Sequence, residues 1–244
     1  KRLRMMRSNT CMLESCGEYN PAFSRYSMIG ALPAEILTRS GDAAQLTDVQ
    51  NGTSTKIVSW LETLDRWSNV FRPGDRLGPT QPGAIGYIGY DNKYEFERLQ
   101  KRTVPDVQIP DIYLVRYDIM HVQDRMTGEC HWVANEGCER QCAELESLLS
   151  SETATDPPRF SLRSLLTPDF THDQYYSAIR RTSDYIRNGD VFQANITGRF
   201  SAGYEGDVIH LYERLRHVTP NPFFALLDFP NPIISTSPER FLAV

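Results

Sequence analysis

The sequence has no apolar run of membrane-spanning length, which argues against a transmembrane helix. It also has no excess of positive charge, because 26 Lys and Arg residues face 31 Asp and Glu residues and the net charge is −5. That balance gives no electrostatic basis for binding nucleic acid. Residues 1–7 are basic, but no apolar segment with a cleavage site follows them, so we expect no secretory signal peptide.

Cysteine is scarce as well. The chain has five cysteines in 244 residues, which is too few for a disulfide-stabilised scaffold. Cys130, Cys138 and Cys142 lie close together, but gaps of eight and four residues with only His131 nearby do not match a zinc-binding pattern. We therefore expect free thiols and a cytoplasmic protein.

The glycines do not form a dinucleotide-binding motif. Gly83, Gly86 and Gly89 recur at every third position, which differs from the Gly-x-Gly-x-x-Gly spacing of such sites. Glycine inside a strand more often allows the close approach of another backbone. Residues 84–90 are therefore predicted to form a tightly packed buried strand.

The remaining patterns indicate a globular α+β protein with mixed or antiparallel sheets flanked by helices. The 40% hydrophobic content is enough for a substantial core. Hydrophobic periodicity predicts helices at 57–67, 136–149 and 208–218, strands at 25–29, 112–122 and 131–134, and a hairpin from 223–228 and 233–235. These elements follow one another without regular β-α-β alternation, which disfavours a doubly wound sheet.

A further helix and strand are predicted within residues 171–200. Thr171 is a good N-terminal cap and Gly189 suits the left-handed position after a helix. The period then changes to two over residues 192–200. One face of this expected strand carries Gln193, Asn195, Thr197 and Arg199. Two interpretations of this polar row stay open. It could line a polar cleft, or it could be the solvent-exposed face of an antiparallel strand.

Three segments together carry a family resemblance. They read Ile-Arg-Asn-Gly-Asp-Val-Phe-Gln at 186–193, Thr-Pro-Asn-Pro-Phe-Phe at 219–224 and Ser-Thr-Ser-Pro-Glu-Arg-Phe at 235–241. Upstream, residues 12–15, 24–27 and 83–91 fit the same family in the same order. The sequence resembles the chorismate-utilising enzymes, namely the large subunits (component I) of anthranilate synthase and aminodeoxychorismate synthase. Asn195 and the Ser-Pro-Glu-Arg-Phe segment favour aminodeoxychorismate synthase.

The resemblance implies an activity and its partners. The complete enzyme would convert chorismate and ammonia to 4-amino-4-deoxychorismate for para-aminobenzoate and folate synthesis, with ammonia supplied from glutamine by a glutamine amidotransferase subunit. Mg²⁺ would be the cofactor, and its ligands, the attacking lysine and the catalytic histidine are expected downstream of Val244. We therefore expect the chain to be a piece of a longer polypeptide, and inactive alone.

The resemblance also implies site residues. Glu239 of Ser-Pro-Glu is the expected acid–base residue, although pairing with Arg240 at a strand end is an alternative role. A tryptophan pocket would use Ser15, Ser24, Arg25, Tyr26, Ser27, Pro222, Phe223 and Phe224. These aromatic residues could instead belong to the core. Thr219 and Phe224 depart from the anthranilate synthase pattern, which weighs against feedback inhibition but leaves the pocket in place.

The expected organisation is an N-terminal domain like that of anthranilate synthase component I at 1–150, a linker at 151–158 and the beginning of a chorismate-binding catalytic domain at 159–244. Two other functions are kept open. One is anthranilate synthase component I itself, and the other is a non-catalytic remnant or a scaffold that binds the glutaminase.

Overall fold

The computed structural model describes residues 8–70, 81–101, 106–150 and 157–242, and internal contacts divide the chain into two units. Unit 1 comprises Lys1–Thr155 and Tyr212–Val244, and unit 2 comprises Asp156–Leu211. The linker expected at 151–158 falls largely outside the described residues. The division into 1–150 and 159–244 stays a prediction for the complete protein. Within this chain, residues after Leu211 group with the N-terminal part because their strands pair with β1.

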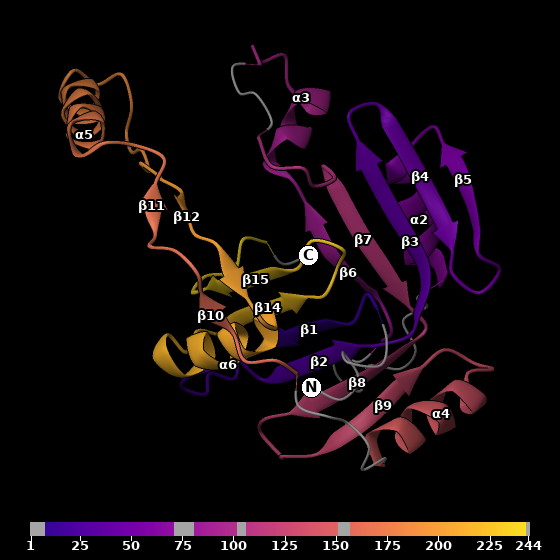
Figure 1. Ribbon diagram of the computed structural model, residues 1–244. Coiled ribbons are helices and arrows are strands. Elements are labelled where there is room, and N and C mark those ends of the chain that lie inside the picture. The colour runs from indigo at the N-terminus through magenta and orange to yellow at the C-terminus, as the bar shows by residue number, and fades with distance from the viewer. Residues whose placement is uncertain (1–7, 71–80, 102–105, 151–156, 243–244) are drawn as a thin grey trace. The chain divides into compact units, whose positions relative to one another are not determined.

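The first sheet of unit 1 has six strands in the order β15-β14-β1-β2-β8-β9, and every neighbouring pair is antiparallel (Figure 1). The strands are β1 (Cys11–Glu14), β2 (Tyr26–Gly30), β8 (Ile119–Asp124), β9 (Cys130–Ala134), β14 (Phe223–Leu227) and β15 (Ile233–Ser237). The predicted strand at 25–29, the pairing of 131–134 with the preceding strand, and the C-terminal hairpin are confirmed. The α+β class is confirmed with them.

The second sheet has five strands in the order β5-β4-β3-β7-β6, again antiparallel throughout. The strands are β3 (Pro33–Ser40), β4 (Ala43–Asp48), β5 (Thr53–Ile57), β6 (Ala84–Ile88) and β7 (Ile112–Tyr117). The single strand predicted at 112–122 is wrong in one respect, because the chain leaves one sheet at Asp118 and enters the other as β8. Apolar residues continue on both sides of Asp118, so the sequence pattern does not reveal the crossing.

The main core lies where the two sheets meet. Cys11 of β1, Tyr113, Val115 and Tyr117 of β7 and Leu227 of β14 belong to one buried cluster. The run Ile-Tyr-Leu-Val of β7 is buried at all four positions, which explains why it is apolar and rich in residues that favour strands.

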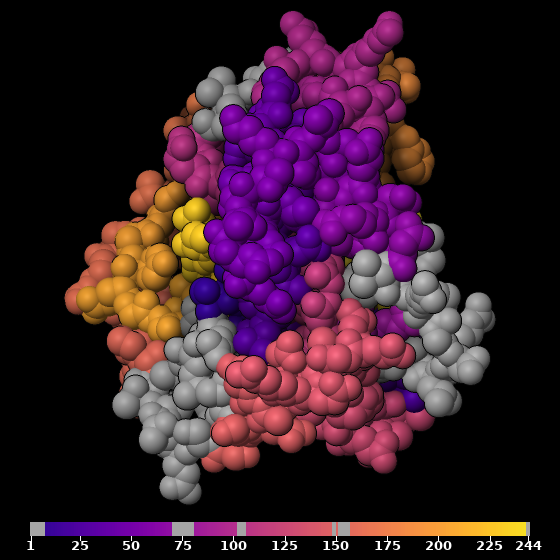
Figure 2. All heavy atoms as spheres, turned by 90° about the vertical axis from the view of Figure 1, so that its right-hand side faces the viewer, coloured from indigo at the N-terminus to yellow at the C-terminus, as the bar shows by residue number. Residues whose placement is uncertain are grey.

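Two helices cover the outer surfaces of unit 1. Helix α2 (Trp60–Val70) packs Trp60 and Trp67 against Leu37 of β3, and α4 (Glu139–Ser150) packs Leu145 against Ile119 of β8. Figure 2 shows this face, with the violet residues of β3, β4, β5 and α2 above the rose residues of α4. Helix α2 begins three residues later than predicted because Ile57 ends strand β5.

A partly buried carboxylate connects α2 to the five-stranded sheet. Glu35 of β3 accepts hydrogen bonds from Arg66 Nη2, Trp67 Nε1 and Arg116 Nε, each 2.8 Å long. Burial raises the pKa of Glu35, but these three donors outweigh it and hold the pKa below its ordinary value of 4.5.

Strand β6 meets β7 through a glycine. A Cβ atom on Gly86 would overlap the carbonyl oxygen of Tyr113 and lie 2.8 Å from Leu114 Cα. The expected close approach of another backbone is confirmed. The strand is shorter and less buried than predicted: it ends at Ile88, only Ile85 is fully buried, and a 3₁₀ turn η1 (Tyr90–Asn92) and α3 (Lys93–Phe96) follow.

Unit 2 contains α5 (His172–Arg187) and two very short ladders. Strand β10 (Ser161–Leu162) pairs with β13 (Tyr204–Glu205), and β11 (Thr167–Pro168) pairs with β12 (Phe200–Ser201). The N-terminal cap at Thr171 is confirmed as a capping box with Gln174, and Gly189 has the expected positive φ of 80°. Helix α6 (Val208–Val218) was predicted with these bounds.

The strand predicted at 192–200 is wrong. Residues 192–199 have no regular secondary structure, and only Phe200 and Ser201 join a ladder. Gln193, Asn195, Thr197 and Arg199 are exposed side chains of an irregular segment. Alternation supplies two faces, but a strand also needs a neighbouring strand to bond its backbone, and none pairs with 192–199 among the described residues.

Candidate functional site

A cavity of about 400 Å³ lies in unit 1, where the last residues of β1 pair with the first residues of β2 and β14. Antiparallel pairing sets Leu13 opposite Met28 on one side and opposite Ala225 on the other, so these three side chains share one face of the sheet. The lining residues are Leu13, Glu14, Ser15, Pro21, Ala22, Phe23, Arg25, Tyr26, Met28, Pro222, Phe223, Phe224, Ala225 and Arg240. We call this cavity the aromatic pocket.

Aromatic rings and guanidinium groups form its walls. The rings of Phe23 and Phe223 lie 6.0 Å apart between centroids. Arg240 lies over Phe223, with its guanidinium carbon 5.4 Å from the ring centroid, and Arg25 lies 4.8 Å from the centroid of Tyr26. The pocket therefore combines apolar surface with positive charge, which suits an aromatic ligand that carries a carboxylate.

The one acidic residue of the lining is already neutralised. Glu14 accepts a hydrogen bond from Tyr212 Oη at 2.5 Å and forms an ion pair with Arg216 Nη2 at 2.6 Å. Burial and the hydrogen bond to Glu14 raise the pKa of Tyr212 far above its usual range, so this phenol stays a donor. Glu14 thus adds little net negative charge to the pocket.

Six of the eight residues predicted for tryptophan binding line the aromatic pocket: Ser15, Arg25, Tyr26, Pro222, Phe223 and Phe224. Ser15 Oγ already donates to the Tyr26 carbonyl at 2.9 Å. Phe224 is 1% exposed and packs edge-on against Tyr212, so its ring belongs to the core. The rings of Phe223 and Tyr26 remain partly accessible.

The other two predicted residues do not line this pocket. Ser24 is completely buried, and its Oγ accepts from Asn20 N at 2.6 Å, which fixes the 20–24 turn beside the pocket. Ser27 Oγ accepts from Ser15 N at 3.2 Å and lines a different cavity.

Sequence reasoning missed Phe23 and Arg240 as pocket residues. Arg240 directly follows the Ser-Pro-Glu motif, but its position over Phe223 depends on the pairing of Phe223 with Ser237 in the hairpin.

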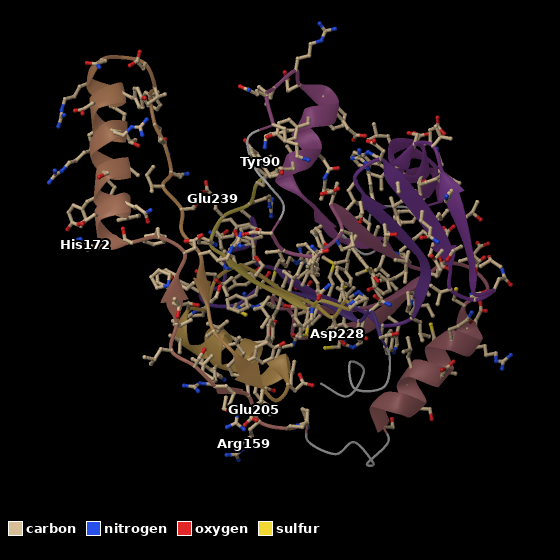
Figure 3. The ribbon with its side chains drawn as sticks, turned by 45° about the horizontal axis from the view of Figure 1, so that its top comes forward. Tyr90, Arg159, His172, Glu205, Asp228 and Glu239 are labelled. Atoms are coloured by element: carbon tan, nitrogen blue, oxygen red, sulfur yellow. The ribbon has the colours of Figure 1, made fainter. Side chains whose placement is uncertain are left out.

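Glu239 lies in a tight turn after β15. Ser237 Oγ donates to the Glu239 carbonyl at 2.9 Å, and Glu239 N donates to Ser237 Oγ at 3.4 Å. Figure 3 shows Glu239 and Asp228 beyond opposite ends of the β14–β15 hairpin. The Glu239 carboxylate is exposed and forms no ion pair with Arg240. The guanidinium of Arg240 instead faces Phe223, which disfavours the strand-end pairing considered above.

Within the described residues no three His, Cys, Asp or Glu side chains come together as a metal site. No helix of the described part of the chain is both long and apolar enough to cross a membrane. All five cysteines are free, as expected.

Comparison with known proteins identifies the family. Residues 19–244 match the model of the chorismate binding enzyme family, and the chain belongs to that family.

Among curated relatives, aminodeoxychorismate synthase component 1 of Escherichia coli strain K12 is 28% identical over 235 residues, covering 95% of this chain and 51% of the relative. Anthranilate synthase component 1 of Thermus thermophilus is 29% identical over 233 residues, covering 90% and 48%. The chain therefore spans about half the length of the curated relatives it matches. Both kinds of relative match at similar identity.

The fold comparison agrees with this result. The crystal structure of anthranilate synthase component I from Streptococcus pneumoniae matches with a TM-score of 0.65 at 24% identity, covering 91% of this chain and 52% of that one. At this identity the match concerns the fold alone.

Proposed function

We propose that the chain is part of an aminodeoxychorismate synthase component I, which uses chorismate and ammonia to make 4-amino-4-deoxychorismate. The observation that carries this choice is the Ser-Pro-Glu-Arg-Phe segment at 237–241, together with Asn195. These residues fit the aminodeoxychorismate synthase pattern better than that of anthranilate synthase. A glutamine amidotransferase subunit as ammonia donor, Mg²⁺ as cofactor and a cytoplasmic location belong to the same proposal.

The second candidate is anthranilate synthase component I. It is supported by relatives of that name that match at similar identity. Both reactions start from chorismate and ammonia. Anthranilate synthase releases the aromatic product anthranilate, whereas aminodeoxychorismate synthase forms 4-amino-4-deoxychorismate.

Within the proposed reaction, Glu239 is the residue that moves a proton at the substituent being exchanged. Two features support this role. Its carboxylate is exposed and forms no ion pair with the described residues, so it is available to a substrate. Pro238 and the bonds to Ser237 restrict the backbone that carries it. A carboxyl group with a fixed position suits general acid–base catalysis.

The aromatic pocket is proposed to hold tryptophan. Phe23 and Phe223 offer faces for an indole ring, and the guanidinium of Arg240, which has no carboxylate partner among the described residues, offers positive charge for its carboxylate; Arg25 is already paired with Asp124. The volume of about 400 Å³ is within the range of small-molecule sites.

The test is a product assay on the complete protein. Chorismate, ammonia and Mg²⁺ are supplied directly, so that no glutaminase is needed, and products are separated by chromatography. The proposal expects aminodeoxychorismate, which a lyase can convert to para-aminobenzoate. Anthranilate as the main product would favour the second candidate. No consumption of chorismate at all would favour a non-catalytic role for the protein.

A further inference from the structure

A second cavity of unit 1 has a different chemical character. Its volume is about 460 Å³, and it is lined by Glu14, Ser15, Cys16, Gly17, Ser27, Gln123, Arg125, Gly128, Arg216 and His217. Ser27 pairs with Gln123 across β2 and β8, so these two side chains share one face of the sheet. Met28 lies one residue beyond Ser27 and therefore faces the aromatic pocket on the opposite side.

We propose that this second cavity is a binding site for a phosphate group, and we call it the oxyanion site. Four side chains from separate parts of unit 1 supply it. Gln123 comes from β8, Arg125 from the turn after β8, and Arg216 and His217 from the last turn of α6. The proposal does not depend on the enzymatic reaction proposed above.

Arg125 is the principal source of positive charge. Its guanidinium donates to the Ser24 carbonyl at 3.0 Å and to the Gly17 carbonyl at 2.9 Å. These acceptors are neutral, and the neighbouring carboxylate of Asp124 is bound by Arg25 at 2.7 Å. Because a guanidinium carries five N–H groups, Arg125 keeps donors for a ligand. Its charge is not paired with any described carboxylate.

The negative charge within the cavity is already compensated. Glu14 faces it but is bound by Arg216 at 2.6 Å and by Tyr212 at 2.5 Å. The C-terminal end of α6 adds partial negative charge, which Arg216 and His217 oppose. Counting Arg125 and Arg216 against Glu14 leaves one net positive charge with His217 neutral.

Neutral hydrogen-bonding groups complete the site. The Gln123 amide and the His217 imidazole are both exposed, and neither forms a side-chain hydrogen bond with another described residue. Amide and imidazole N–H groups beside a guanidinium are typical ligands of phosphate oxygens. Gly128 also lines the cavity, and a Cβ there would meet nothing within 4 Å.

The experiment follows the imidazole resonances of the complete protein by NMR during titration with inorganic phosphate. His217 is assigned from the loss of its signal in His217→Gln. His172 lies on α5, and its side chain is 78% exposed, so its resonance serves as an internal reference. We expect the His217 resonance to shift saturably while that of His172 stays constant. A parallel titration with glycerol phosphate distinguishes free phosphate from an esterified ligand, and chloride at matched ionic strength controls for screening.

Two charge-matched variants test the location. Gln123→Glu places a negative charge in the oxyanion site, and we expect it to weaken phosphate binding at least tenfold, since the interaction acts over a few ångströms. Gln45→Glu makes the same change on an exposed position of β4, in the other sheet and outside the cavity lining, and should leave the dissociation constant within about twofold because solvent and salt screen an exposed charge. Melting curves check that both variants fold. Parallel shifts of His217 and His172, an equal response to chloride, or equal weakening in both variants would overturn the proposal.

Discussion

Gly86 offers the sharpest test of how the five-stranded sheet is packed. A Cβ atom at this position would overlap the Tyr113 carbonyl oxygen, and it would lie 2.8 Å from Leu114 Cα and 2.9 Å from the Tyr113 carbonyl carbon. All three are backbone atoms of the paired strand β7, which cannot rotate away as a side chain can. Gly86→Ala therefore requires β6 and β7 to separate.

The cost of this separation can be estimated. Overpacking a rigid site typically costs about 1–3 kcal/mol, and each backbone hydrogen bond lost from the ladder costs about 1 kcal/mol more. We expect a destabilisation of roughly 3 kcal/mol or more. In a domain of this size, each kcal/mol of destabilisation lowers the melting temperature by about 2–4 °C. We therefore expect the melting temperature of Gly86→Ala to be lower by roughly 6–12 °C.

Gly83 is the matched control because it belongs to the same series of glycines. A Cβ there would meet nothing within 4 Å, and its φ is not positive. Gly83→Ala should be neutral or stabilising by about 0.4–1 kcal/mol, since alanine restricts the unfolded chain. Thermal unfolding followed by circular dichroism compares both variants with the wild type. Equal melting temperatures for Gly86→Ala and Gly83→Ala would refute the packing of β6 described above.

Three further predictions concern charge and function. Because the folded pKa of Glu35 is depressed, ionised Glu35 stabilises the folded protein above the ordinary pKa of 4.5, and this stabilisation is lost as pH falls through the folded pKa. Acidification from about pH 5 to about pH 3 should therefore lower the melting temperature of the wild type more than that of Glu35→Gln. Arg240→Ala should weaken tryptophan binding by about fivefold through loss of its charge and its contact with a ring, whereas Arg180→Ala on exposed α5 should not, as isothermal calorimetry would show. In the complete protein, Glu239→Gln should lower kcat by about 10²–10⁴-fold with little change in KM; steady-state kinetics that retain normal kcat would assign the residue a structural role.

Local signals in the sequence were sufficient for several elements. The cap at Thr171 and the glycine at 189 fixed the ends of α5 through backbone hydrogen bonds and a positive φ that depend on few neighbours. Helix α6 and the β14–β15 hairpin followed from periodicity and from the prolines between them. Strands β3, β4 and β5 were not assigned, although Asn51-Gly52 is a strong turn signal between two of them.

Residues 192–200 show where periodicity fails. The alternation there is as clear as in a true strand, yet residues 192–199 pair with no described strand. Sequence alternation reports which side chains are apolar, whereas a strand exists only where a second backbone satisfies its N–H and C=O groups. The same reason explains why the crossing at Asp118 from one sheet to the other was not foreseen.

The candidate site divides along the same line. The sequence alone determined the family resemblance, the Ser-Pro-Glu motif and six of the residues that line the aromatic pocket, because these depend on residue identity and local motifs. Tertiary structure decided that Leu13 meets Ala225, that Phe224 turns into the core against Tyr212, and that Arg240 closes over Phe223. It also brought Arg125 and His217 to one cavity. Such contacts join residues far apart in the chain, and they form only when burial and backbone pairing fix the register of the strands that carry them.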